Sequence, residues 1–232
     1  MSLLSVEDVH TYYGQSHVLQ GVSLEVEDGE IVALLGRNGV GKTTTLRTIL
    51  QLTPPRSGVV RFRGEDVTGR PTHEVAAMGM GWVPEDRRMF GHLTVAENLR
   101  VAASTSPNPA SAMEAAYELF PDLDRFRDKE SRNLSGGQQQ MLALARGFIG
   151  DNDLLLVDEP SEGLAPLIVE DVVEALDRIS GETTMILVEQ NFSLAMDLAD
   201  RFYLLDQGRV VESGATEGVT AEDERIRRYL SA

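Results

Sequence analysis

The chemistry of the chain is clearest in a glycine-rich stretch near position 40. Residues 36–43 read Gly-Arg-Asn-Gly-Val-Gly-Lys-Thr and match the pattern G-x-x-x-x-G-K-[ST]. Glycines at these positions let backbone N–H groups converge on phosphate oxygens, and a helix that starts at the lysine adds its N-terminal dipole. The stretch therefore predicts a nucleotide phosphate site, a phosphate loop, formed by Gly36, Arg37, Asn38, Gly39, Val40, Gly41, Lys42, Thr43 and Thr44.

Polar side chains in and beyond the loop predict phosphoryl chemistry. Lys42 is expected to bridge the β- and γ-phosphates, Thr43 to ligate Mg²⁺, and Thr44 to reach the α-phosphate. Asp158 ends an apolar run, the strand-end position of a metal-holding carboxylate, and Glu159 is placed to activate the attacking water. An Asp-Glu pair after a strand is more often a solvated turn. The phosphate loop in the same chain favours the functional interpretation.

The residues around the loop predict a strand–loop–helix unit of a buried parallel sheet. Ile31 to Leu35 is continuously apolar and of strand length, and Lys42 to Leu52 fits a helix. Shorter segments separated by glycines predict further strands, with hairpins, at Leu4 to Val9, Gly21 to Val26 and Val59 to Arg63.

The periodicity changes along the rest of the chain. From about Pro71 to Gly150 the pattern is helical, with helices expected at Ala96 to Ala103, Ala112 to Phe120 and Gln138 to Phe148. After Asp151 strands and helices alternate, at Leu154 to Val157, Ala165 to Ile179, Thr183 to Val188 and Phe192 to Leu198, before a hairpin near Gly208 and a short helix from Ala221. Such alternation predicts one parallel α/β core split by a helical insertion.

Composition excludes several classes of protein. No apolar run approaches the roughly 18 residues that span a bilayer, and the N-terminus lacks a basic leader, so we expect a cytoplasmic location. Cysteine is absent and the four histidines lack metal-ligand spacing, so neither a disulfide nor a zinc site is expected. A formal net charge of −16 opposes nucleic-acid binding. The acidic, lysine-poor composition suggests adaptation to high salt; a GC-rich genome would explain the arginines but not the acidic excess.

A second glycine motif resembles that of a known family. Leu134-Ser135-Gly136-Gly137-Gln138-Gln139-Gln140 opens a predicted helix some twenty residues before Asp158. With the phosphate loop it closely resembles the signature motif of the ATP-binding-cassette (ABC) ATPases. In isolation the motif could be a plain helix N-cap with flexible glycines. In the family two cassettes clasp ATP head to tail, so the resemblance implies that Ser135, Gly136 and Gly137 serve the nucleotide of a partner cassette, either identical or paralogous.

The resemblance covers nearly the whole chain and implies a fold and further site residues. It implies an α/β phosphate-loop ATPase core with a mostly parallel sheet, an N-terminal antiparallel β subdomain and an inserted α-helical subdomain. We expect a single domain, 1–232, whose core comprises 1–85 and 151–232 and whose helical subdomain comprises 86–150. Tyr13 stands where family members stack an aromatic ring on adenine, with Val18 beneath it, although a plain strand-end aromatic is the alternative. The loop from Ser161 to Ala165 would touch the partner cassette.

Two expected catalytic positions depart from the family pattern. Glu85 stands where Gln is usual, in the loop between the core and the helical subdomain, and Gln190 stands where the switch His is usual. Gln190 can donate a hydrogen bond to a γ-phosphate but cannot carry a proton. Glu85 can ligate Mg²⁺ but adds negative charge beside Asp158 and Glu159. The departures suggest reduced or asymmetric hydrolysis.

The same departures resemble one branch of the family. Val83-Pro84-Glu85, residues 159–166 and Val188-Glu189-Gln190-Asn191 are similar to the second ATP-binding subunit of branched-chain amino acid importers. Residues 12–19 are also similar to urea and short-chain amide importers. The resemblance implies ATP and Mg²⁺, membrane permease subunits docking near Arg87 to Thr94, a solute-binding protein acting indirectly, and a place on the inner face of the membrane. The alternatives are a soluble ABC protein without membrane partners and a regulatory nucleotide-binding module.

Overall fold

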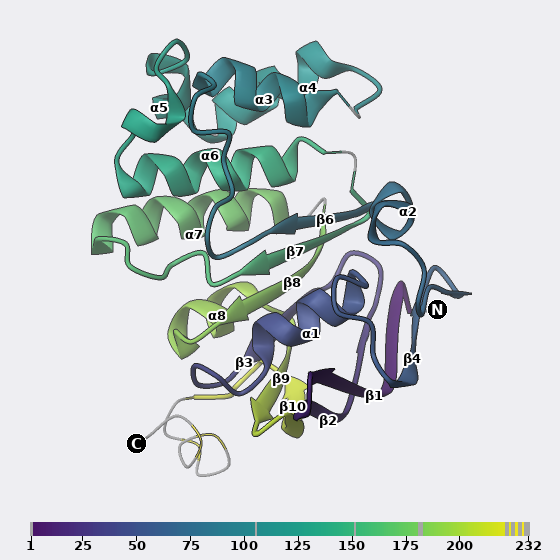
Figure 1. Cartoon of the computed structure of the whole chain (residues 1–232). Coiled ribbons are helices and arrows are strands. Elements are labelled where there is room, and N and C mark those ends of the chain that lie inside the picture. Colours follow the sequence, from purple (N-terminus) through teal and green to yellow (C-terminus); the bar gives the residue numbers. More distant parts are fainter. Residues whose placement is uncertain are drawn as a thin grey trace.

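The computed structural model describes residues 2–104, 106–150, 152–180 and 183–220, and the single residues 223, 226 and 229. This part of the chain contains a six-stranded sheet, a four-stranded sheet, and helices packed on and between them (Figure 1). The helix expected from Ala221 falls largely outside the described residues, and so does position 151, where the second part of the core was expected to begin. None of the described helices is long and apolar enough to cross a bilayer.

The larger sheet has the order β10-β9-β3-β8-β7-β6. Its neighbouring strands are parallel except for the antiparallel pair β9–β10. The strands are β3 (Ile31–Leu35), β6 (Met80–Val83), β7 (Leu154–Asp158), β8 (Thr184–Glu189), β9 (Arg201–Asp206) and β10 (Arg209–Ala215). Both faces of β3, β7 and β8 are buried, which explains their continuous apolar runs. The predicted α/β class with a mostly parallel sheet is confirmed.

Alternate residues of the central strands enter two separate apolar clusters. Ala33 of β3 belongs to the cluster that includes α6 (Gly136–Phe148) and α7 (Pro166–Ser180). Its neighbour Leu34 points to the opposite face and belongs to the cluster that includes α1 (Lys42–Ile49). Figure 1 shows α6 and α7 on one side of the sheet and α1 on the other. The remaining short helices of the core are α2 (Thr72–Ala77) and α8 (Phe192–Leu198).

The smaller sheet is antiparallel and covers α1 from the other side. Its order is β2-β1-β4-β5, with β1 (Leu4–Tyr13), β2 (Ser16–Val26), β4 (Ser57–Phe62) and β5 (Glu65–Asp66). Buried residues of β1, β2 and β4 share one cluster with Leu46 and Ile49 of α1, so this helix lies between the two sheets. The N-terminal β subdomain is therefore present, with a longer β1–β2 hairpin than the sequence predicted.

The segment from Pro71 to Gly150, expected to be helical, contains the expected helices and one unexpected strand, β6. Besides α2, its helices are α3 (Val95–Ala103), α4 (Pro109–Leu119), α5 (Pro121–Arg125), the 3-10 helix η1 (Ser131–Asn133) and α6. The expectation of helical character from Pro71 onward is wrong at β6, which pairs in parallel with β7. The four residues of β6 include Gly81 and follow Gly79, so its strand character comes from pairing with a distant segment rather than from a local pattern.

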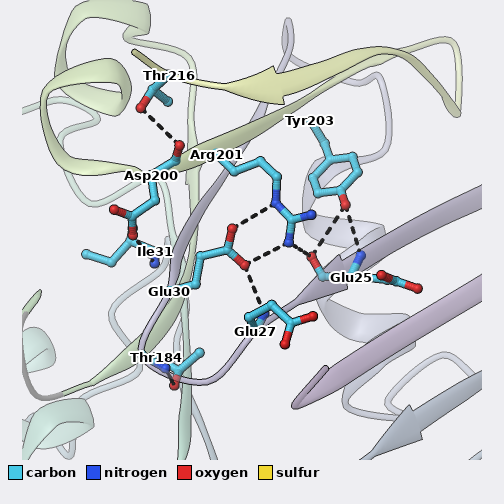
Figure 2. A network of polar contacts seen from close by, with 10 residues as sticks. Glu25, Glu27, Glu30, Ile31, Thr184, Asp200, Arg201, Tyr203 and Thr216 are labelled. Carbon is cyan, nitrogen blue, oxygen red and sulfur yellow. Dashed lines mark hydrogen bonds and ion pairs between the residues drawn. The ribbon is translucent and has the colours of Figure 1, made fainter. Parts of the chain in front are cut away.

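A polar network joins the two sheets where β2, β3 and β9 approach one another (Figure 2). Arg201 donates from Nε and Nη2 to the Glu30 carboxylate at 2.8 and 2.7 Å, and Nη2 also donates to the Glu25 carbonyl at 2.9 Å. The backbone N–H of Glu25 donates to the Tyr203 hydroxyl at 3.1 Å. Asp200 accepts from the backbone N–H of Ile31 at 2.9 Å. One guanidinium therefore holds the smaller sheet against β9.

Loss of this guanidinium should destabilise the fold. Arg201→Ala removes two of the three hydrogen bonds to the largely buried Glu30 carboxylate, which keeps only the N–H of Glu27 as a donor among the described residues. It also removes one of the two donors to the Glu25 carbonyl. We expect the free energy of unfolding to fall by about 2–3 kcal/mol. Urea unfolding at pH 7.5 measures the change. Arg125→Ala is the matched control, because Arg125 and Asp122 form an exposed pair and its loss should cost less than about 0.5 kcal/mol. Equal losses in the two variants would contradict a role for the network.

Candidate functional site

The phosphate loop lies between the end of β3 and the start of α1, as the sequence predicted. Gly36 and Gly41 have φ values of +147° and +115°, which L side chains rarely adopt. A Cβ at Gly36 would collide with the backbone carbonyl of Leu205, and one at Gly41 would lie 2.8 Å from Leu19 Cδ2. Both glycines are therefore required by backbone conformation and by close packing.

The turn between β9 and β10 braces this loop. The N–H of Gly208 donates to the Val40 carbonyl at 2.9 Å, and the Gly208 carbonyl accepts from the N–H of Gln20 at 2.8 Å. A Cβ at position 208 would collide with the Val18 carbonyl. One glycine, Gly208, therefore hydrogen-bonds both to the phosphate loop and to β2 and fixes the spacing between them.

Lys42 is buried and already paired. Its Nζ donates to the carbonyls of Gly36 and Arg37 at 2.7 and 3.1 Å and lies 3.0 Å from Glu159 Oε1. Both charged side chains are shielded from solvent, with exposed fractions of 3% and 8%. In this state the Glu159 carboxylate occupies the position beside the ammonium that an anionic ligand could take.

Asp158 has one satisfied and one unsatisfied oxygen. The Thr43 hydroxyl donates to Oδ1 at 3.2 Å, whereas the buried Oδ2 has no hydrogen-bond partner among the described residues. Burial raises the pKa of Asp158 to about 6, against the hydrogen bond from Thr43, and the charges of Glu159 and Glu85 add to the increase. A buried orphan carboxylate oxygen beside a hydroxyl is a suitable start for a Mg²⁺ site.

A cavity of about 320 Å³ opens over these groups. Its lining residues are Val18, Asn38, Gly39, Gly41, Lys42, Thr43, Thr44, Glu85, Glu159 and Glu162. The structure therefore brings most of the predicted phosphate loop, Val18 and two of the predicted catalytic residues to one cavity. No group of three or more His, Cys, Asp or Glu in the described residues has metal-binding geometry, so a cation here would need oxygens from a ligand as well.

Glu162 lines the cavity, whereas the sequence placed it only in the loop expected to touch the partner cassette, Ser161 to Ala165. Its pKa is raised to about 7, first by a hydrogen bond with Glu159 and then by burial, with the charges of Glu159 and Glu85 adding to the increase. Its spacing of three residues from Glu159 across a tight turn is the signal that could have revealed it. Glu159 therefore lies between the ammonium of Lys42 and the carboxyl group of Glu162, whose raised pKa favours its protonated form.

Gly36, Arg37 and Val40 of the loop and Asp158 are not among the lining residues, and three further predicted groups lie away from the cavity. Tyr13 is 44% exposed at the end of β1, with its hydroxyl 3.4 Å from Thr53 Oγ1. Gln190 is exposed after β8. The remaining group, Ser135, Gly136 and Gly137, lies at the start of α6, so it is not brought to the chain's own phosphate loop.

The start of α6 is capped without a ligand. Ser135 Oγ accepts from the N–H of Gln138 at 3.3 Å, and Gln138 Oε1 accepts from the N–H of Ser135 at 3.0 Å. A Cβ at Gly137 would lie 2.7 Å from Ile168 Cγ2 of α7. Ser135 is therefore the N-cap of α6 in the isolated chain. Position 137 also needs a small residue, because a larger one would collide with α7.

Glu189 is a second residue that sequence analysis missed. It is 2% exposed, and its carboxylate accepts from the Ser161 N–H and hydroxyl at 3.1 and 3.0 Å and from the Asn191 N–H at 3.2 Å. Burial raises its pKa, against these hydrogen bonds. The loop after β7 and the loop with Gln190 are therefore tied together. An acidic residue directly after the apolar run 185–188 of β8 was the available signal.

The buried charge of Asp158 should make stability depend on pH. Its folded-state pKa of about 6 exceeds its unfolded value of about 3.9, so the destabilisation is small at pH 4, grows as the pH rises through 6 and is nearly complete at pH 8. In EDTA, Asp158→Asn should therefore raise the free energy of unfolding by about 2–3 kcal/mol at pH 8 and change it little at pH 4. Urea unfolding at the two pH values measures this.

Asp66→Asn provides the opposite case. Hydrogen bonds from Thr68 lower the pKa of Asp66, so this substitution should give no gain at pH 8. A pH-independent gain in Asp158→Asn would contradict the expected titration.

Comparison with known proteins agrees with the fold and the motifs. The family described as ABC transporter matches residues 19–162, more than half of the chain. The chain is 42% identical over 212 residues to the high-affinity branched-chain amino acid transport ATP-binding protein BraG of Pseudomonas aeruginosa, covering 90% of this chain and 91% of the relative. It is 33% identical over 230 residues to the probable branched-chain amino acid transport ATP-binding protein LivF of Archaeoglobus fulgidus, covering 97% of each.

A solved structure extends the likeness to three dimensions. An ATP-binding subunit of an ABC transporter matches with a TM-score of 0.85 at 26% identity, covering 100% of both chains. Sequence and fold agree over nearly the whole length, and the chain therefore belongs to the ABC transporter family, as one of its ATP-binding ATPases.

Proposed function

We propose that this chain binds and hydrolyses ATP to power an importer of branched-chain amino acids. The observation that carries the proposal is one cavity lined by most of the phosphate loop, by Glu159 and by Thr43, whose hydroxyl donates to Asp158. The solute is inferred from two relatives whose names specify branched-chain amino acid transport and which match this chain over nearly its full length. Urea or a short-chain amide is the alternative solute.

Binding of ATP would replace contacts that the site makes with itself. The phosphates would take the N–H groups of the loop and the ammonium of Lys42, which now contacts Glu159. Glu159 would then be free to accept a proton from the attacking water, and Gln190 would donate a hydrogen bond to the γ-phosphate. Glu85, at the cavity wall, would contact the same region and moderate hydrolysis through its charge.

The residues present fit a magnesium ion. Asp158 offers a buried carboxylate oxygen without a hydrogen-bond partner, Thr43 offers its hydroxyl, and Glu85 lines the same cavity. Mg²⁺ is bound in such sites by one or two carboxylates together with phosphate oxygens, and it supplies charge neutralisation on the phosphates when bound.

The location of Ser135, Gly136 and Gly137 supports a two-cassette site. They begin α6, away from the cavity of their own chain, so a second cassette, identical or paralogous, would present them to the nucleotide. In this proposal 1–85 and 151–232 form the nucleotide-binding core and 86–150 the helical part that carries Ser135. Tyr13 and Val18 would contact the adenine.

A basic groove supports a membrane subunit as a second partner. The groove has a volume of about 520 Å³ and is lined by Arg87, Arg88 and Arg146, with Trp82 and apolar residues but no Asp or Glu. Trp82 Nε1 and Arg146 Nε are buried without hydrogen-bond partners among the described residues. In a chain of net charge −16, such a groove suits an acceptor-rich segment, such as a helix end with carboxylates, from a permease at the inner face of the membrane.

Adaptation of the acidic surface to high salt stays a hypothesis.

The two-cassette proposal predicts a trapped dimer. Glu159→Gln removes the base, so phosphate release should fall by about 10²–10⁴-fold while ATP still binds. In sedimentation experiments with ATP, Mg²⁺ and concentrated KCl this variant should sediment as a dimer, and without ATP as a monomer. Adding Lys42→Ala should abolish the dimer. A variant that binds ATP but stays monomeric would instead indicate a paralogous partner cassette, and unchanged phosphate release would contradict the role of Glu159.

The groove can be tested by reversing one exposed charge. The Arg88 side chain pairs at the surface with Asp86, and its backbone carbonyl accepts from Arg146. Arg88→Glu therefore reverses one charge of the groove, loses the exposed pair with Asp86 and keeps the hydrogen bond with Arg146. We expect unchanged ATPase activity of the isolated chain and at least a several-fold loss of co-purification with its co-expressed membrane subunits. Arg125→Glu on α5, an exposed arginine outside the groove, is the control. Equal recovery of complex in both variants would contradict docking at this groove.

A further inference from the structure

The hairpin formed by β1 and β2 carries two of the residues assigned to the adenine. Val18 on β2 lines the cavity, whereas Tyr13, the last residue of β1, leaves 44% of its surface exposed. Gly14 follows with φ +60° and has open space around its missing Cβ, so the turn needs the glycine for its backbone conformation alone. A ring at such a tip can stack on a base only if the tip is held in place.

The strand ladder reaches the tip, where Tyr13 pairs with Ser16, but only after an irregularity. Thr11 pairs with Leu19, but the next residue, Tyr12, pairs with His17, so the register shifts by one residue just before the turn. Irregularities of this kind bend a strand and re-aim its side chains. The Tyr13 hydroxyl lies 3.4 Å from Thr53 Oγ1, and further side-chain contacts hold the residues on either side of Tyr13.

Arg56 supplies such contacts from the segment that precedes β4. Its Nη2 donates to the Gly14 carbonyl at 2.5 Å, and its guanidinium carbon lies 4.0 Å from the centre of the Tyr12 ring. Its backbone N–H donates to the His10 carbonyl at 2.8 Å. One side chain thus contacts the residue before Tyr13 and the residue after it.

The Tyr12 ring is also fixed from β2. The His17 ring stacks on it with centroids 4.2 Å apart and planes 5° apart. His17 Nε2 is 3.0 Å from His10 Nδ1, so one of these imidazoles donates to the other, and His10 Nε2 lies 3.3 Å from Asp8 Oδ1. This chain of contacts joins Tyr12 to the body of β1.

We propose that Arg56 is a positioning residue for the nucleotide base: by holding Tyr12 and Gly14, it sets the Tyr13 ring for stacking on adenine, with His17 and His10 supporting Tyr12. The proposal rests on the proposed function. Both neighbours of Tyr13 are held while its ring stays accessible, so little conformational freedom is lost when the base binds. The contribution of an exposed cation–π contact to folding is small, so the effect of Arg56 should appear in base recognition rather than in stability.

Comparison of two ligands separates the base from the phosphates. Dissociation constants of ATP and of inorganic triphosphate, each with Mg²⁺, are measured by calorimetry on the full chain. Arg56→Ala should raise the constant for ATP by about 3- to 10-fold and leave that for triphosphate unchanged. His17→Ala should act in the same direction. Arg61→Ala is the control, because Arg61 lies on β4 of the same sheet and pairs with Glu7 at the surface, away from the turn.

A double-mutant cycle with Tyr13→Ala identifies the route of the effect. If Arg56 acts through Tyr13, Arg56→Ala should not weaken ATP binding further in the Tyr13→Ala background. The inference is overturned if Arg56→Ala leaves ATP binding unchanged while Tyr13→Ala weakens it, if triphosphate binding weakens equally, or if the two effects add. A Tyr13→Ala variant with unchanged ATP binding would refute the adenine assignment itself, whereas a wild-type chain that binds neither ligand would refute the proposed function.

Discussion

The side-by-side order of β3, β8 and β7 brings together the three loops that carry the phosphate-binding and acidic residues of the site. In a parallel sheet the carboxyl ends of neighbouring strands lie at one edge, and here Leu35 pairs with Glu189 while Asp158 pairs with Val188. The phosphate loop, the Asp158–Glu159 pair and the Glu189–Gln190 pair therefore emerge at adjacent points. Glu189 then ties two of these loops, since its carboxylate accepts hydrogen bonds from Ser161 and Asn191.

This convergence concentrates negative charge around a single lysine. Asp158, Glu159, Glu162 and Glu85 face the region of Lys42, and the raised pKa values of Asp158 and Glu162 express the cost of placing carboxylates close together in a partly buried site. The structure limits that cost through the Lys42–Glu159 pair. The carboxylates of such a site outnumber its cations, so an anionic ligand needs to bring a cation with it to balance the charge.

The sequence revealed features encoded by contiguous residues and missed those created by distant pairing. The loop, the continuous strands β3 and β7 and the start of α6 have local patterns, so their positions could be predicted. β6 could not, because its four residues become a strand through pairing with β7. Glu189 was overlooked for the same reason, because its role comes from a contact with Ser161 on a separate loop. Glu162 lies only three residues from Glu159, and its role depends on the tight turn between them. Their type was visible, but their partners were not.

The turn at Gly208 links three segments that are far apart along the chain. Its N–H holds Val40, its carbonyl holds Gln20, and the absence of a side chain leaves room for the Val18 carbonyl. An evolving sequence therefore cannot alter this turn independently of β2 and the phosphate loop. A shortened or enlarged β9–β10 hairpin would need compensating changes in β2 and in the phosphate loop. We therefore expect related sequences to differ mostly outside these three segments, and to change them together where they do change.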